Sequence, residues 1–446
     1  MTSMILNANG VDDTAALIAA FNSGANSFEL QGKFVISASI KNWPSNSEIF
    51  CRSLGAATII AKPGVNFEYC IYGSGIGNLR IRGLVIDANQ VNRAGILTTR
   101  SVPILLNDAT NVLVEDCIFQ NAIGTTLEPA FCFAVGGNSS KVIIKTSQAL
   151  NGGTATKPAD GFYCSASKSL IQGCIAENCT DTAFALESCS MSRISDCISD
   201  NCSAGGAIVN SSNTDTYGNS INNLTINNWN APVTGGLQIG NPLSTSTGVL
   251  YDTIVDNVII RANTLAGFGN GAAINVRSTG TPKPTNTKIS NCTVTGASAQ
   301  GILFNGSTES KAFGNSVTQT GASGIQFNNG VDHVAQGNTT NRTAFGIVLN
   351  SNASATLKNN TCSNTSYGVY AFDTSVINSY YNTVVNPTVA YQGKDIGATL
   401  NLRGALAGAR MVGSLVNAPV GGAQSFKEPI YDQAGNLMGY VPIYAT

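Results

Sequence analysis

The chain has 446 residues and a net charge of −1, and only 11% of its residues are charged although 43% are hydrophobic. A near-neutral chain carries no basic stripe that would release counterions, which argues against nucleic acid as a partner. No apolar run reaches the length of a membrane span, and the polar segment after Met1 predicts no signal peptide.

The N-terminal segment predicts a cap. Within VDDTAALIAAFNSG, Asp12 or Asp13 is the expected N-cap of a helix over residues 14–21 that has one apolar face. We expect residues 1–40, the helix plus a first strand, to cover the open end of a solenoid, which would otherwise expose unpaired strand edges.

Residues 41–160 alternate short apolar runs with longer loops. Runs such as NLRIRGLVIDAN from Asn78 and NVLVEDCIFQN from Asn111 place a turn-forming residue between two β-branched stretches, which predicts a bent pair of strands. Residues 120–160 depart most from a regular pattern, and long insertions into a repeat often form its binding face.

Residues 161–380 repeat, most clearly between 301 and 371. Four glycines there are spaced 23, 22 and 22 residues apart, and apolar residues occupy the first and third positions after each one: Gly301, Gly324, Gly346 and Gly368. Alternation of this kind indicates a strand buried on one face. The series continues toward the N-terminus through Gly161, Ala183, Gly206, Gly236 and Gly271.

Each period therefore contains a strand, a turn, a bent strand pair and a loop. A period of about 22 residues suits one coil of a right-handed, single-stranded parallel β-helix. A leucine-rich repeat would need fixed leucines, and a propeller blade would need roughly double the period. We predict an all-β parallel β-helix over residues 41–392 and a short β element over 393–446 that turns at 434–436 and acts as a cap or oligomerisation element.

The twelve cysteines favour a reduced, buried ladder over a disulfide framework. Cys174 and Cys197 are 23 residues apart, as are Cys179 and Cys202, so each pair should stack in successive coils as small hydrophobes. A zinc site is the alternative, but CxxC spacing is missing and His333, expected in a surface loop, is the only histidine. We expect no metal and no cofactor.

GVDDTAAL, followed by GKFVIS and NLRIRGLVIDAN, resembles the start of the pectate-lyase-like superfamily. That grouping includes bacteriophage tailspikes, polygalacturonases, alginate lyases and mannuronan epimerases. The plan of the chain is most similar to tailspike polysaccharide depolymerases, which implies a homotrimer located in a virion tail or outside a bacterial cell. The Asp-Pro-His-Glu run of the epimerases and the Gly-His-Gly loop of the polygalacturonases are both absent, which disfavours those two activities.

Few acidic residues fall on the predicted strands. The fourth position after each repeat glycine forms one row, in which only Glu187 is acidic: Ser165, Glu187, Asn210, Gly240, Asn275, Asn305, Asn328, Asn350 and Phe372. Asp160 lies one coil earlier, and Glu128 lies in the irregular insertion before it. Because glycosidic hydrolysis needs two carboxyl groups, we predict Glu187, Asp160 and Glu128 as catalytic residues, with Asp181 in reserve.

The predicted substrate-binding residues are Asp181, Arg193, Tyr163, Lys157 and Asn210. Arg193 could bind an anionic sugar or could be an ordinary surface charge. Each acid also has a structural alternative: Asp160 and Asp181 as turn caps, Glu128 as a solvated loop residue, and Glu187 as a replacement within an internal asparagine ladder.

The resemblance and the acids together favour an enzyme that cleaves a bacterial surface polysaccharide, such as a capsule, exopolysaccharide or O-antigen, by hydrolysis with paired carboxylates. Two alternatives stay open. One is a polysaccharide lyase of the same fold, which would need a base and a cation to neutralise a uronate. The other is a non-catalytic fibre that only binds a glycan receptor.

Overall fold

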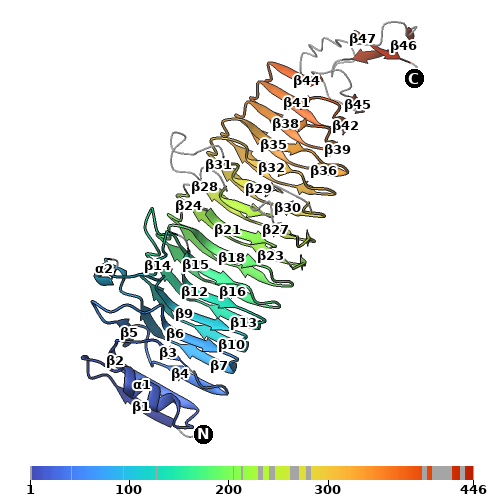
Figure 1. Cartoon of the computed structure of the whole chain (residues 1–446). Coiled ribbons are helices and arrows are strands. Elements are labelled where there is room, and N and C mark those ends of the chain that lie inside the picture. The colour runs from blue at the N-terminus through green and yellow to red at the C-terminus, as the bar shows by residue number, and fades with distance from the viewer. Residues whose placement is uncertain are drawn as a thin grey trace.

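The computed structural model describes residues 3–41, 43–93, 95–126, 128–203, 205–211, 214–229, 235–240, 247–261, 271–277, 283–393, 399–403, 424–431 and 437–444. In these ranges the two helices are α1 (Thr14–Phe21) and α2 (Gln90–Arg93), and the other regular elements are β-strands. Figure 1 shows the strands stacked into a rod, with β1 (Ser3–Asn7) near one end and β44 (Val389–Gly393) near the other.

Each coil contributes one strand to each of three parallel ladders, which we call faces C, A and B in chain order. In one coil, β18 (Thr182–Glu187) lies on face C, β19 (Arg193–Ser195) on face A and β20 (Ile198–Asp200) on face B. Strands pair with their counterparts in the next coil, so residues one period apart become vertical neighbours. The predicted parallel β-helix is confirmed.

In the described residues, face C is a ladder of 14 strands, which at roughly 4.8 Å per strand makes the rod about 60 Å long. Its strands are β3 (Ile40–Lys41), β6 (Tyr69–Ser74), β9 (Val102–Asn107), β12 (Ala130–Gly136), β15 (Ala159–Cys164), β18, β21 (Gly205–Asn210), β25 (Leu237–Ile239), β29 (Ile274–Arg277), β32 (Ile302–Asn305), β35 (Ser323–Asn328), β38 (Phe345–Asn350), β41 (Tyr367–Ala371) and β44.

The predicted register of face C is right in most coils and wrong in one. The residues after the repeat glycines pair as expected, Ile302 with Ile325 and Ile325 with Ile347. In β29, however, Ile274 pairs with Ile302, so Arg277 rather than Asn275 lies opposite Asn305. The strand begins at Ile274, two residues after the position that Gly271 predicts.

The core consists of inward rows that stack along the rod. Phe162 and Phe184 lie with ring centroids 5.5 Å apart, and Phe304 and Phe327 with centroids 4.9 Å apart, both pairs nearly parallel. All twelve cysteines are buried free thiols. The thiols of Cys174 and Cys197 are hydrogen-bonded to each other, as are those of Cys179 and Cys202, so the predicted thiol ladder is confirmed.

The turn between faces A and B places one side chain inward in every coil. In the C-terminal coils this residue is Asn315, Asn338, Asn360 or Asn382, and the first three each donate from Nδ2 to the Oδ1 of the next, at 2.8–2.9 Å. The internal asparagine ladder therefore lies in this turn. The row of Asn305, Asn328 and Asn350 considered for it is half-exposed on face C, which corrects that alternative.

Both ends of the rod differ in detail from the prediction. Helix α1 has the predicted bounds, but Asp13, at its N-cap, makes no capping bond and instead accepts from the backbone N–H groups of Asn9 and Val35. The repeat continues one strand beyond Gly393, because β45 (Thr399–Arg403) pairs with β42 (Val376–Tyr380) on face A.

Strands β46 (Gln424–Tyr431) and β47 (Leu437–Tyr444) pair antiparallel, as expected for the terminal hairpin. The predicted turn at 434–436 lies outside the described residues. Strand β1 already pairs with β2 (Ser27–Ile36) in parallel, so the ladders begin inside the segment predicted as a cap. The domain bounds of 1–40, 41–392 and 393–446 stay a proposal.

Candidate active site

Asp160 is a buried carboxyl group at the start of β15. Its side chain is only 8% exposed, and Oδ1 accepts a hydrogen bond of 2.9 Å from the backbone N–H of Thr182, the first residue of β18 in the next coil. The parallel register explains this contact, because the starts of adjacent strands lie above one another. Asp160 is thus fixed between two coils.

Negative neighbours surround Asp160. Burial raises the pKa of Asp160 well above its ordinary value, and the charges of Asp181 and Glu187 raise it further, while the Thr182 N–H acts in the opposite direction. Burial also raises the pKa of Asp181. Two neighbouring buried carboxyl groups cannot both ionise easily, because the two negative charges would repel each other. Asp160 therefore retains a proton to higher pH than an exposed aspartate does.

Glu187 and Tyr163 form the second half of this cluster. Burial raises the pKa of the Tyr163 hydroxyl, and so do the charge of Glu187 and a hydrogen bond to it. The neutral phenol therefore donates to the Glu187 carboxylate. Asn210 pairs in register with Glu187 and is 6% exposed. The structure thus brings together five of the predicted residues: Asp160, Tyr163, Asp181, Glu187 and Asn210.

Glu128 and Lys157 lie in two loops that enter face C from face B. Glu128 is exposed and closes a turn, in which its N–H donates to Thr125 Oγ1 at 2.9 Å. Lys157 closes a similar turn with Thr154. The Ala130 N–H donates to the Pro158 carbonyl at 3.1 Å, so the two loops stack at the edge of face C where β15 begins.

Two other residues lie elsewhere than expected. Arg193 begins β19 on face A, where its Nη2 donates to Ser195 Oγ at 3.2 Å, so its predicted contact with substrate beside Glu187 stays a prediction. His333 is not in a surface loop. It is 1% exposed in β36 (His333–Gln336), with its ring 4.8 Å from that of Phe327, and burial lowers its pKa to about 4.

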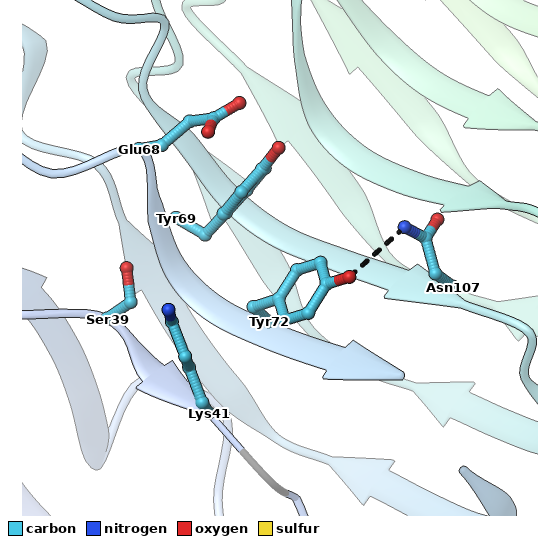
Figure 2. Close-up of a pocket in the computed structure, with 6 residues that line it drawn as sticks. All are labelled: Ser39, Lys41, Glu68, Tyr69, Tyr72 and Asn107. Carbon is cyan, nitrogen blue, oxygen red and sulfur yellow. Dashed lines mark hydrogen bonds between the residues drawn. The ribbon is translucent and has the colours of Figure 1, made fainter. Parts of the chain in front are cut away.

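A pocket of about 470 Å³ at the N-terminal coils of face C is the main feature that the sequence did not reveal. Its lining residues, shown in Figure 2, are Ser39, Lys41, Glu68, Tyr69, Tyr72 and Asn107. The two tyrosine rings lie 5.2 Å apart at 36°. The sequence signal is weak, because loop insertions separate these strands by about 30 residues and obscure the period.

Arg100 connects this pocket with the carboxyl cluster. Its guanidinium group donates to Glu68 at 2.8 Å and to the Tyr69 hydroxyl at 3.1 Å, and it lies 5.5 Å from the centroid of the Phe131 ring. The ring centroid of Phe131 in turn lies 4.6 Å from that of Tyr163. Side-chain contacts therefore run without a break from the pocket to Glu187.

No group of three or more metal-binding side chains is arranged to hold a metal ion in the described ranges. Within the same ranges, no helix is both long enough and apolar enough to cross a membrane.

The comparisons with known proteins identify the fold. Residues 241–389, a third of the chain, match a family model described as a right handed beta helix region, which confirms the expected handedness. No curated protein matches the sequence.

Solved structures give the same result over more of the chain. Gene product 12 of bacteriophage phi29 in its pre-mature form has a TM-score of 0.66 at 16% identity, over 86% of this chain and 55% of that one. Tailspike protein 3 of bacteriophage CBA120 has a TM-score of 0.53 at 13% identity, over 98% and 65%. The catalytic unit of an α-1,3-glucanase from Streptomyces thermodiastaticus has a TM-score of 0.50 at 11% identity, over 88% and 67%. The chain thus spans only part of each phage protein, and identities this low establish the fold alone.

Proposed function

We propose that this protein is a tailspike-like depolymerase that binds and hydrolyses a bacterial surface polysaccharide. The observation that supports it best is the cluster of Asp160, Asp181 and Glu187 on face C, continuous with a surface of tyrosine, arginine and phenylalanine side chains. Aromatic faces can stack on the apolar faces of sugars, and carboxyl groups supply the proton transfers of glycoside hydrolysis.

Asp160 is the proposed general acid. Its raised pKa keeps it protonated at a pH where an exposed aspartate has lost its proton, as protonation of a leaving oxygen requires. Glu187 is the second carboxylate, acting as nucleophile or base, and Tyr163 holds it through the hydrogen bond from its hydroxyl. Asp181 keeps the proton on Asp160 through its charge.

The remaining predicted residues have proposed roles around this centre. Glu128 is the carboxylate that could reach the glycan from the loop before β12. Lys157, in the adjoining loop, and Asn210, beside Glu187, are proposed to bind sugar hydroxyls or acidic groups. A homotrimer in a virion tail is the proposed assembly, which the likeness of the fold to a phage tailspike supports.

The test is incubation of the protein with a panel of bacterial capsular, exopolysaccharide and O-antigen preparations, with new reducing ends as the readout. Hydrolysis should decline as the pH rises through the pKa of Asp160, because the acid then loses its proton. Ultraviolet absorbance of an unsaturated uronate product would instead identify a lyase. Retention on glycan without any product would identify a binding fibre, and a single-chain mass by light scattering would contradict the trimer.

A further inference from the structure

The pocket between the first coils of face C is built from aromatic and charged side chains that lie outside the carboxyl cluster. Tyr72 of β6 lies directly above Lys41 of β3 in the parallel register, and the hydroxyl of Tyr72 accepts from Asn107 Nδ2 at 3.5 Å. Both tyrosine rings are half-buried, so they are held in place while part of each ring remains accessible. This is the construction of a binding pocket.

The charged side chains around the pocket are two cations and one carboxylate, so one cation, Lys41, is in excess. Glu68 is already paired with Arg100, at 2.8 Å, and also interacts with the Tyr69 hydroxyl. Lys41 is exposed, and in the described part of the chain it has no carboxylate within ion-pair distance. Its ammonium group therefore remains available for an anionic ligand.

The pocket also lies in line with the carboxyl cluster. Tyr72 pairs with Leu105, Leu105 with Ala134, and Ala134 with Tyr163, so three strand spacings, about 14 Å, separate Tyr72 from Tyr163 along one row. A short oligosaccharide spans such a distance. The contacts through Arg100 and Phe131 provide a continuous surface for it.

We propose that this pocket is a binding subsite for an acidic sugar unit of the same polysaccharide, stacked on Tyr69 and Tyr72 with its carboxylate held by Lys41. This inference rests on the proposed function and narrows its substrate to glycans that carry uronic, sialic or similar acids. Asn107 and Ser39 supply hydrogen-bonding groups for the sugar hydroxyls.

The experiment measures binding by the full chain carrying Glu187→Gln, so that glycans are not consumed. The probe is an array of bacterial capsular and O-antigen oligosaccharides in which acidic members and neutral members are both present. Adding Lys41→Met should weaken binding of acidic members about tenfold, which is the loss of one charge-assisted contact. Adding Tyr72→Ala should weaken binding about tenfold through lost stacking.

Matched controls lie at the opposite end or on another face of the rod. Lys358→Met replaces an exposed lysine of β39 (Ser354–Lys358) on face A, and Tyr381→Ala replaces a tyrosine that is 61% exposed near the C-terminal coils. Neither should change binding. Melting temperatures equal to the parent would show that each variant remains folded.

The outcomes separate the two proposals. Unchanged binding by both pocket variants, with cleavage intact in the wild-type protein, would overturn the subsite and leave the depolymerase standing. Binding of neutral members only would overturn the acidic ligand. A wild-type protein that neither binds nor cleaves any glycan would remove the proposed function and the subsite with it.

Discussion

The N-terminal and C-terminal coils have the same backbone but stabilise the same turn with different chemistry. At the turn between faces A and B, the residue with positive φ is followed by one inward side chain in each coil. That side chain is a buried thiol at Cys117, Cys174 and Cys197, but an amide from Asn315 onward. The thiols pack as small apolar groups and make only weak hydrogen bonds, whereas the amides make strong hydrogen bonds to one another and to the backbone.

The outer surface of face C differs between the same two regions. In the N-terminal coils it carries acids, tyrosines and an arginine, and the loop before β12 (residues 121–129) is longer than the loop before β35 (residues 319–322). In the C-terminal coils the corresponding row carries Asn305, Asn328 and Asn350. The difference indicates that coils rich in internal hydrogen bonds provide a rigid support, while the coils with long loops carry the chemistry.

The strongest test of this contrast replaces one side chain of the same outer row of face C in each of the two regions. Glu187→Gln should lower hydrolysis about a thousandfold, because it removes a carboxylate without changing its shape. Asn328→Ala, the control in the C-terminal coils, should leave the rate unchanged. Reducing-end assays on a cleaved glycan provide the measurement, and equal losses in both variants would remove the distinction between the two regions.

Substitutions of the inward side chain at the turn between faces A and B should have the next largest effect, which is on stability. Asn338→Leu should cost about 3 kcal/mol of stability, because Asn338 donates to Ala312 O and Asn360 Oδ1 and accepts from Asn315, leaving buried groups unpaired. Cys197→Ala, at the equivalent position of an N-terminal coil, should cost only about 1 kcal/mol of packing. Urea unfolding midpoints rank the two, and a larger loss for the cysteine variant would contradict the contrast.

His333 makes the C-terminal coils sensitive to acid. The ring is buried, and its folded pKa of about 4 lies below the ordinary 6.5 because burial outweighs the opposite effect of the Ser310 backbone. As the pH falls below 6.5, the unfolded chain binds the proton first, so stability decreases until about pH 4, by up to about 3 kcal/mol. His333→Leu should remove this pH dependence. Melting curves between pH 4 and 7 test it, and a slope that persists in the variant would assign the effect to other groups.

His333 also shows where prediction from the sequence stops. The period alone predicts the coils, the rows and the placement of Asp160 and Glu187 on strands of adjacent coils, because strand pairing requires a fixed repeat. It does not predict that His333 faces inward beside Ala355, since its segment lacks a clear apolar alternation. Glycine at 330 makes the room, because a Cβ there would lie 2.5 Å from the imidazole Nε2.

The same limit applies to the candidate site. Tyr163 and Glu187 lie in regular coils and Asp160 directly precedes the first of them, so the repeat predicts that all three lie on adjacent strands of one face. The pocket around Tyr69 and Tyr72 lies where insertions such as residues 88–101 lengthen the coils, so its strands have no constant spacing to count. Arg100 comes from one of these loops, and only the folded structure places it beside Glu68.

The smallest expected effect concerns Tyr163, whose hydroxyl holds Glu187. Tyr163→Phe removes one hydrogen bond to a charged group, so hydrolysis should decrease about tenfold, while Tyr367→Phe in the C-terminal coils should change nothing. A positioning role predicts that the loss falls on kcat and not on KM, with an unchanged melting temperature, because the Glu187 carboxylate loses the hydrogen bond that orients it. A purely structural role would instead lower the melting temperature. Full activity would mean that Glu187 works without the phenol, and the cluster would then reduce to its three carboxyl groups.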